Sequence, residues 1–170
     1  MSKLLLARIS EVLDYDPTTG LFTWKIHTHS RRGKIVPGTI AGTDDKQGRV
    51  QIKVAGKSYR AHRLAFLFMT GRMPPKGKDV DHINGVDSDN RWLNLRPAKR
   101  GQNNWNNHKV RANSKSGKTG VSWVTRLGKW LARVKVNGVA IDIGHFAKLK
   151  DAIKARQEAE LKYFGEFAPK

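Results

Sequence analysis

Asp81 and His82 are adjacent in the sequence, and Asn84-Gly85 follows them in what reads as a turn. Hydrolysis of a phosphodiester needs a base that deprotonates water, a hard cation that neutralises charge on the phosphorane, and groups that hold both in register. Oxygen ligands such as Asp and Asn suit Mg²⁺ or Mn²⁺, which keep several waters and accept few protein ligands. A histidine beside such an aspartate can act as the base, because its ordinary pKa lies near neutrality. The segment therefore holds the residue types that metal-assisted phosphodiester hydrolysis requires.

A plainer interpretation of Asp81 to Gly85 is an Asx-type turn with a histidine facing solvent. The nearby Asp87 and Asn90 fit turn or helix-cap positions better than ligand positions. His62 fits a packing role or a phosphate contact better than catalysis. Two arginines could clamp phosphate or simply be solvated, namely Arg63 and Arg96. Three histidines have no predicted functional role, namely His27, His29 and His145.

Short helices and strands must position this segment. Upstream of it, apolar spacing and turn residues predict a helix over 4–13, strands over 21–25, 49–54 and 57–60, and a helix over 61–70 that ends at Gly71. Downstream of it, a strand over 93–96 leads through Pro97 into a polar helix that holds Asn103 and Asn104.

A second pattern occupies the C-terminal part of the chain. Strands are predicted over 120–126, 129–136 and 139–144, and a final helix over 149–164. Asn137-Gly138 between alternating apolar residues is a strong hairpin signal. The polar, basic stretch 109–118 lacks apolar periodicity and predicts a flexible linker. The sequence thus predicts an α+β chain with domains over 1–108 and 119–167.

The charge of the chain favours a polyanionic partner. The net charge is +19 and the pI is about 10.6, which also makes such binding dependent on salt. Between Asp89 and Asp142 there is no acidic residue, whereas the same stretch holds twelve Lys or Arg, together with Trp105, Trp123 and Trp130. A solvated basic face is the plainer interpretation of a charge run, but nucleic-acid binding explains this pattern better.

The sequence also excludes several other classes of protein. The chain has no cysteine, which excludes disulfides and Cys-ligated zinc. The longest apolar run, 64–69, is too short to span a bilayer, and residues 1–13 lack a signal-peptide cleavage site. We therefore expect a soluble, cytoplasmic protein that has no membrane partner.

Several motifs together resemble the HNH endonucleases of phages, in particular the intron-encoded homing endonucleases. They are His62-Arg63-Leu64-Ala65, the run Val80-Asp81-His82-Ile83-Asn84-Gly85, Asn90, Asn94-Leu95-Arg96 and Asn103. The resemblance covers about residues 60–107. It implies the ββα-metal fold, in which a β-hairpin and a following helix hold one divalent metal ion.

The resemblance also implies roles for individual residues. His82 would be the general base, and Asp81 and Asn103 would bind one Mg²⁺ or Mn²⁺ ion. Asn94 would hold the hairpin and orient His82. Asn103 stands where other HNH proteins carry a final histidine, and His108, five residues further on, is not assigned to the metal.

Residues 115–164 resemble the ethylene-response-factor (Apetala-type) DNA-binding domain of plants. The similarity lies in Gly120-Val121, the run Gly128 to Ala132, Asn137-Gly138 and Gly144-His145-Phe146. It implies a three-stranded sheet that enters the major groove of DNA. Ser122 and Arg133 depart from the plant pattern, so the plant target sequence does not carry over.

Strand periodicity supports a DNA-binding face independently. Lys129, Leu131, Arg133 and Lys135 share one face of their strand, whereas Trp130, Ala132 and Val134 share the other. If the helix covers the apolar face, the basic face stays free for phosphates and base edges. Trp123 or Trp130 could instead be a core residue, and this alternative is preferred for Trp130. The predicted DNA contacts are Arg63, Arg96, Trp123, Thr125, Arg126, Lys129, Arg133 and Lys135.

These features predict an HNH nuclease core with an N-terminal β region, linked to a three-stranded antiparallel sheet packed on one helix. The leading hypothesis is metal-dependent hydrolysis of double-stranded DNA by a monomer or weak dimer, with one strand nicked per monomer. A phage-encoded chain would act in the cytoplasm of its bacterial host. The rival is a non-catalytic, sequence-specific DNA-binding regulator on a nuclease scaffold. RNA cleavage is a third option, but a sheet that reads the major groove favours duplex DNA.

Overall fold

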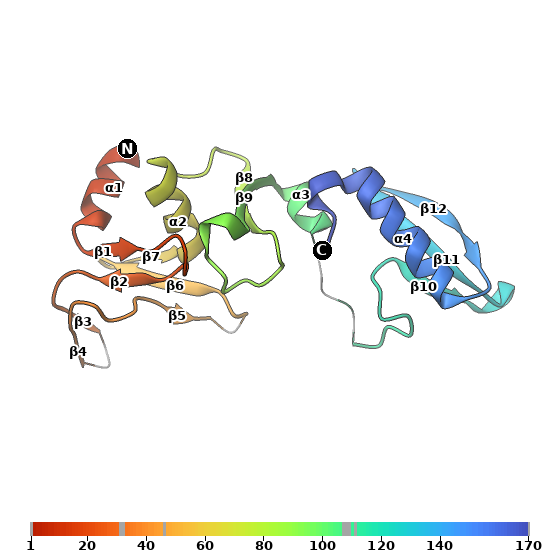
Figure 1. Cartoon of the computed structure of the whole chain (residues 1–170), viewed down its shortest axis with the longest axis horizontal. Helices are drawn as coiled ribbons and strands as arrows, with labels where there is room; N and C mark the ends of the chain where they lie inside the picture. The colour runs from red at the N-terminus through yellow and green to blue at the C-terminus, as the bar shows by residue number, and fades with distance from the viewer. Residues whose placement is uncertain (1, 31–32, 46, 107–109, 111, 170) are drawn as a thin grey trace. The chain divides into compact units, whose positions relative to one another are not determined.

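The computed structural model describes residues 2–30, 33–45, 47–106, 110 and 112–169. It shows short helices and several small antiparallel sheets, which confirms the predicted α+β class (Figure 1). The chain divides into two compact units, Met1–Arg100 and Gly101–Lys170. The predicted domain limits, 1–108 and 119–167, remain a prediction.

The first unit is built from four small sheets and two helices. Its helices are α1 (Ser2–Ser10) and α2 (Ala61–Thr70), with a 3-10 turn at Trp92–Asn94. The paired strands are β1 (Leu13–Tyr15) with β2 (Phe22–Trp24), β3 (Thr28–Ser30) with β4 (Gly33–Ile35), β5 (Thr43–Asp44) with β6 (Val50–Val54) and β7 (Lys57–Arg60), and β8 (Lys78–His82) with β9 (Leu95–Lys99).

One apolar core holds this unit together. Helix α2 has apolar residues at helical spacing, so that Leu64 and Leu67 are fully buried against Ile9, Phe22 and Ile52. Burying each of these side chains stabilises the fold by about 1.5–3 kcal/mol. The helix ends where its C-terminal glycine adopts the left-handed conformation that favours glycine. Because β8 follows α2 through a short connector, the core also fixes the hairpin that carries the predicted site.

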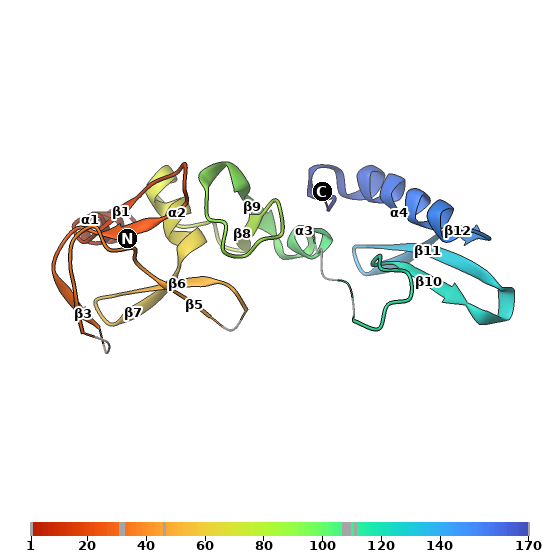
Figure 2. The ribbon, with the colours of Figure 1, turned by 60° about the horizontal axis from the view of Figure 1, so that its bottom comes forward.

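The second unit is a three-stranded antiparallel sheet with a helix on one face (Figures 1 and 2). Its elements are α3 (Arg100–Trp105), β10 (Val121–Val124), a 3-10 turn (Thr125–Leu127), β11 (Lys129–Val136), β12 (Val139–Phe146), α4 (Leu149–Phe164) and a terminal 3-10 turn (Gly165–Phe167). Positive φ angles at Asn137 and Gly138 form the tight turn between β11 and β12 that the Asn-Gly pair predicts.

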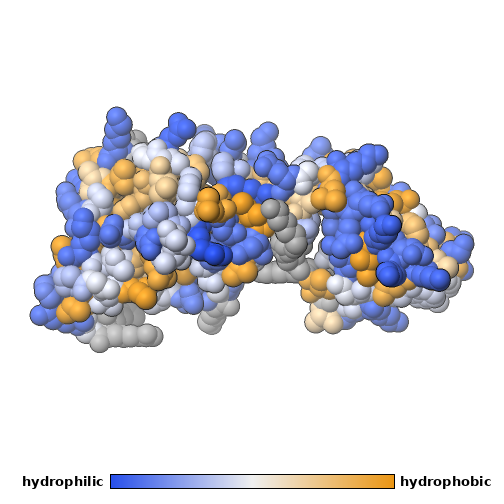
Figure 3. Space-filling model, in the orientation of Figure 1, coloured by the Kyte–Doolittle hydropathy of each residue, from blue (hydrophilic) through white to orange (hydrophobic). Residues whose placement is uncertain are grey.

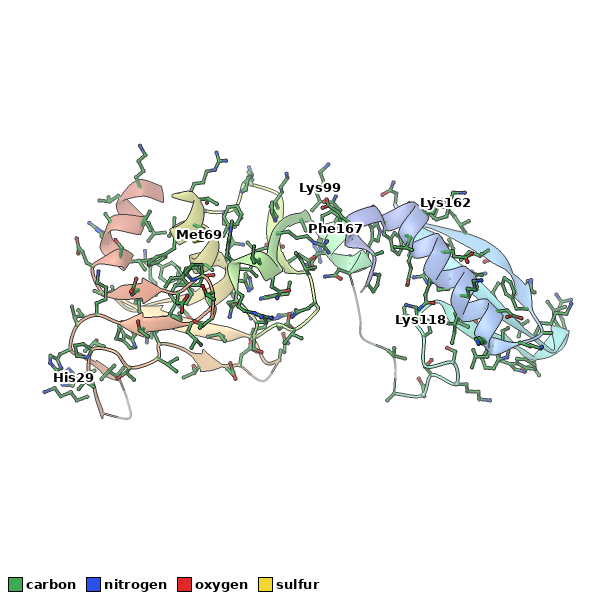
Figure 4. All side chains as sticks on the ribbon, in the orientation of Figure 1. His29, Met69, Lys99, Lys118, Lys162 and Phe167 are labelled. Carbon is green, nitrogen blue, oxygen red and sulfur yellow. The ribbon has the colours of Figure 1, made fainter. Side chains whose placement is uncertain are left out.

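Helix α4 buries a polar network that the sequence pattern does not reveal. Arg156 is 7% exposed and donates to the carbonyl oxygens of Arg133 and Thr119. Glu160, one turn further on, pairs with Arg156 at 3.1 Å and with Lys118, labelled in Figure 4, at 2.9 Å. Burial lowers the pKa of Arg156, although the Glu160 carboxylate opposes that shift. The network ties the segment before β10 to the helix.

The outer side of α4 carries Lys150, Lys154 and Gln157, and Figure 3 shows a largely hydrophilic surface there. None of the helices within the described ranges is long and apolar enough to cross a membrane.

Several predicted element limits are wrong. The first helix stops at Ser10, and Leu13 begins β1 instead of ending the helix. Residues 92–94 form a 3-10 turn, so the strand predicted over 93–96 begins only at Leu95. Thr125 and Arg126 lie in a 3-10 turn beyond β10. In each case a turn shorter than the predicted element takes over, because local hydrogen bonds to a carbonyl three residues back end the regular structure.

Part of the predicted linker, 109–118, lies outside the described residues. In the part that the structure describes, Ser116 is 9% exposed, and its hydroxyl donates to the carbonyl oxygen of Val121 at 2.6 Å. This end of the segment is thus anchored to the first strand of the sheet.

Candidate functional site

The hairpin of β8 and β9 places Asp81 and His82 at its end. Asp81 lies opposite Arg96, and His82 opposite Leu95. The two side chains are 4% and 5% exposed. Arg96 donates from Nε to the Asp81 carboxylate at 2.9 Å, and its Nη2 lies 2.8 Å from the same oxygen. Any cation that binds Asp81 must therefore displace this guanidinium or share the carboxylate with it.

The His82 ring is enclosed by three polar side chains. Its Nε2 is 3.3 Å from Asn90 Oδ1, and its Nδ1 is 3.9 Å from Asp87 Oδ1. The ring of His62, from the first turn of α2, meets it edge-on with centroids 5.1 Å apart. His82 is thus held inside the protein, not on an open surface as the turn interpretation expects.

His62 stays uncharged beside His82. Burial lowers the pKa of His62 to about 3, and electrostatic interactions with His82 and then Arg60 contribute to the same shift. A neutral ring can pack against a second imidazole without repulsion. This geometry fits the packing role that the sequence analysis favours for His62.

Asn94 ties together the loop between the two strands. Its Oδ1 accepts from the backbone nitrogen of Asn84 at 3.0 Å. Its Nδ2 donates to Asn84 Oδ1 at 3.0 Å and to the carbonyl oxygen of Asp89 at 2.8 Å. The backbone of Asn94 also accepts from Ile83, the residue after His82. Asn94 therefore fixes the backbone on both sides of the loop.

Asp89 stabilises the same loop through hydrogen bonds from Arg91 and Asn84. The side chain of Arg91 hydrogen-bonds its carboxylate and lowers the pKa of Asp89 to about 2, with smaller contributions from the Arg91 backbone and from Asn84. Asp89 therefore stays ionised and holds Asn84 at 2.7 Å. Neither Asp87 nor Asp89 joins Asp81 in a three-ligand group, and within the described part of the chain no three His, Asp or Glu side chains could hold a metal ion.

Asn103 lies on α3, in the second unit, and is exposed. Helix α3 follows β9 directly in the sequence, so a hairpin and then a helix occur in the predicted order. His108 lies outside the described residues. One carboxylate and one amide oxygen are a donor set that fits Mg²⁺ or Mn²⁺, because these ions keep several waters.

The predicted DNA contacts of the second unit lie on and around the sheet. Val134 and Ala132 are buried beneath α4, whereas Lys129, Arg133 and Lys135 are exposed. The exposed set also includes Thr125, Arg126 and Trp123.

One ion pair modifies this face, and one predicted contact lies on the other face. Arg133 pairs with Asp142 across the strands, a contact that raises the pKa of Arg133 and lowers that of Asp142. Trp123 is 40% exposed, but it lies opposite Trp130 in the register of β10 and β11 and meets it edge-on at 5.1 Å, so it shares the face of Trp130 and not the basic face. Trp130 packs against the cluster of Val121 and Ala132, as expected of a core residue. The basic face is therefore partly neutralised by one aspartate.

In the first unit, Arg63 and Arg96 both have carboxylate partners. Arg63 Nη1 is 3.1 Å from Asp79, and its side chain is 35% exposed. The side chain of Arg96 is 12% exposed. Both remain predicted phosphate contacts. Of the histidines with no predicted role, His29 lies exposed on β3, where Figure 4 labels it.

The segment that contains this hairpin is similar to a known protein family. Residues 59–105 match the family model of an HNH endonuclease. This stretch, referred to below as the HNH segment, contains α2, the β8–β9 hairpin and α3, with Asp81, His82, Asn94 and Asn103. The resemblance predicted for about 60–107 is confirmed at the level of the family model.

No curated protein matches the chain significantly. Among solved structures, the one titled "DNA binding and cleavage by the HNH homing endonuclease I-HmuI" is similar to this chain with a TM-score of 0.40 and 19% sequence identity. The similarity covers 84% of this chain and 76% of that one.

Sequence reasoning missed part of the surroundings of His82. Tyr15 Oη donates to the carbonyl oxygen of Asn90 at 2.7 Å, across 75 positions of the chain. Gly20, in the turn between β1 and β2, lies against the backbone of Asn90 and Arg91. The Asp16-Pro17-Thr18-Thr19-Gly20 turn is visible in the sequence, but no local signal shows which loop it contacts.

Proposed function

We propose that this chain is a metal-dependent endonuclease that hydrolyses phosphodiester bonds in double-stranded DNA. The observation that carries the proposal is the HNH segment, in which Asp81 and His82 are adjacent at the end of a hairpin that Asn94 braces. The donor types and the net charge of +19 agree with it.

Asp81 and Asn103 would hold one Mg²⁺ or Mn²⁺ ion. When bound, such an ion neutralises charge on the phosphate that is being cleaved. Arg96, which pairs with Asp81, would then share or release the carboxylate and could turn its charge toward a phosphate oxygen, as predicted for a DNA contact. The ion pair would thus hold the Asp81 carboxylate in place until the metal and DNA bind.

His82 would take the proton from the attacking water, and Asn94 would keep the hairpin in the geometry that this transfer needs. Because His82 is 5% exposed, the side chains that cover it must shift to admit water and phosphate. Catalytic hydrogen bonds often tighten only in the complex with substrate, so a covered ring is compatible with this role.

The basic sheet of the second unit would bind the DNA duplex. Lys129, Arg133 and Lys135 would contact phosphates and base edges, and Trp123, Thr125 and Arg126 would extend the contact at the first strand. Arg63 would bind a phosphate near the hairpin. Because the chain has one HNH segment, a monomer should nick one strand, as expected of a homing-type enzyme.

A nicking assay on supercoiled plasmid tests this proposal. We expect relaxed circles with Mg²⁺ or Mn²⁺ and none with EDTA. Persistent supercoiled DNA in every metal, together with tight DNA binding, would instead support the rival, a DNA-binding regulator on a nuclease scaffold. A labelled RNA duplex in the same reaction separates DNA from RNA cleavage, and its preferential cleavage would contradict the assignment of DNA as substrate.

A further inference from the structure

We propose that Asn90 is a positioning residue that fixes the hydrogen of His82 on Nε2, and that the turn between β1 and β2 holds Asn90 in place. The inference rests on the proposed function, because it concerns the nitrogen with which His82 acts as a base. It assigns the N-terminal hairpin a part in the site.

The hydrogen-bond pattern of Asn90 determines the orientation of its amide. Nδ2 donates to the carbonyl oxygen of Ser88 at 3.0 Å, and a carbonyl oxygen can only accept. The oxygen end of the amide therefore faces the His82 ring, where Oδ1 is 3.3 Å from Nε2. Since Oδ1 also can only accept, Nε2 must carry the hydrogen.

The other ring nitrogen then carries the lone pair. In a neutral imidazole one nitrogen is a donor and the other an acceptor, so a hydrogen on Nε2 makes Nδ1 the basic nitrogen. Asp87 Oδ1 is 3.9 Å from Nδ1, which is too far for this carboxylate to hold a hydrogen there. His82 would thus abstract the proton from water through Nδ1.

The backbone of Asn90 is itself held by a hydrogen bond. It is 3% exposed, and its carbonyl oxygen accepts from the Tyr15 hydroxyl at 2.7 Å. Burial, reinforced by Asp16 and then Asp89, raises the pKa of Tyr15 to about 12, so the hydroxyl keeps its hydrogen. This bond is available at any pH at which the enzyme would work.

The turn makes two more contacts with the same loop. The backbone nitrogen of Trp92 donates to the carbonyl oxygen of Pro17 at 3.0 Å. Gly20 has a φ of 76°, and a Cβ atom there would stand 2.4 Å from the Arg91 nitrogen and 2.5 Å from the Asn90 carbonyl carbon. Only glycine permits this approach. One contact from the end of β1 and two from the turn that follows it therefore set the position of Asn90.

Nitrogen-15 NMR of the full chain, labelled at histidine, tests the inference without DNA or metal. The ring shifts identify which nitrogen carries the hydrogen, and His82→Ala identifies the signals of His82. We expect the hydrogen on Nε2 in the wild-type protein and in Asn90→Asp, which keeps an acceptor. In Asn90→Leu we expect loss of this single tautomer. A wild-type hydrogen on Nδ1, or an unchanged ring in Asn90→Leu, would overturn the inference.

Cleavage kinetics separate positioning from simple loss of fold. We expect Asn90→Leu to lower kcat about 100-fold at unchanged KM, since a misplacement of about 1 Å can cost that much. Tyr15→Phe should give a smaller loss in kcat, and Ser88→Ala, which keeps the backbone carbonyl, none. Equal effects of Asn90→Leu on KM and kcat would overturn the positioning role. So would a kcat in Asn90→Asp that is as low as that in Asn90→Leu. If the wild-type chain does not cleave DNA at all, the proposed function fails, while the ring shifts still report the Asn90–His82 bond.

Discussion

Replacing Asn94 by alanine should loosen the loop between β8 and β9. The change removes three hydrogen bonds, one from the Asn84 nitrogen, one to the Asn84 side chain and one to the Asp89 carbonyl. Because Asn94 is 8% exposed, water does not readily replace the lost partners. At about 1 kcal/mol for each bond, the loop should lose about 3 kcal/mol of local stability.

Amide hydrogen exchange at Asn84 measures this loss directly, since its N–H donates to Asn94 Oδ1. A loss of about 3 kcal/mol corresponds to exchange about 100-fold faster. Asn94→Asp keeps the acceptor but loses both Nδ2 bonds, so it should show an intermediate increase. The Ile52 amide, on β6 in the core, serves as the internal reference. Unchanged exchange at Asn84, or equal acceleration in both variants, would refute the reasoning.

Three further predictions concern the turn, the buried histidine and the basic sheet. Gly20→Ala should unfold the first unit at a lower urea concentration than Gly48→Ala. Both glycines have a φ of 76°, but a Cβ on Gly20 would meet backbone atoms at 2.4 and 2.5 Å, whereas one on Gly48 would meet nothing within 4 Å. Equal urea midpoints would contradict this. The pKa of His62 is about 3 in the folded protein, against an ordinary value of 6.5, so the unfolded chain takes up a proton at higher pH than the folded chain does. The free energy of unfolding therefore keeps its full value above pH 6.5 and falls as the pH drops toward 3. The free energy of unfolding should fall by up to about 1.4 kcal/mol per pH unit in this range. In urea unfolding, His62→Phe should abolish this dependence on pH. The same dependence in both proteins would exclude His62 as its source. Lys135→Gln should reduce the slope of the logarithm of the DNA-binding constant against the logarithm of salt concentration by about one unit. Lys150→Gln, on the outer side of α4, should leave this slope unchanged. Identical slopes for the two variants in fluorescence-anisotropy titrations would exclude Lys135 from the DNA interface.

Elements with a strong local pattern could be predicted from the sequence. The helix over 149–164 and the strand over 129–136 have the predicted limits, because apolar periodicity and an Asn-Gly turn act within a few residues. The short strands β3 and β4 were not predicted, since three-residue strands have too few side chains to show alternation.

The residues of the HNH segment could be named in advance, but their surroundings could not. Asp81, His82 and Asn94 are recognisable from the resemblance to HNH endonucleases, and the family model matches that stretch. The contact between Tyr15 and Asn90 joins residues 75 positions apart, so it depends on how the first unit packs. Arg156 was likewise missed, because a charged residue on a helix normally faces solvent, and its burial depends on Glu160 and on strand carbonyls.

Cleavage and binding measured on the same His82→Ala protein test the central claim most directly. If His82 is the general base, this variant should nick plasmid at least about 100-fold more slowly than wild type while its affinity for the same DNA stays nearly unchanged. His29→Ala, which removes an exposed histidine from β3, should match the wild type in both measurements. Wild-type cleavage by His82→Ala, or a parallel loss of cleavage and binding, would contradict the account.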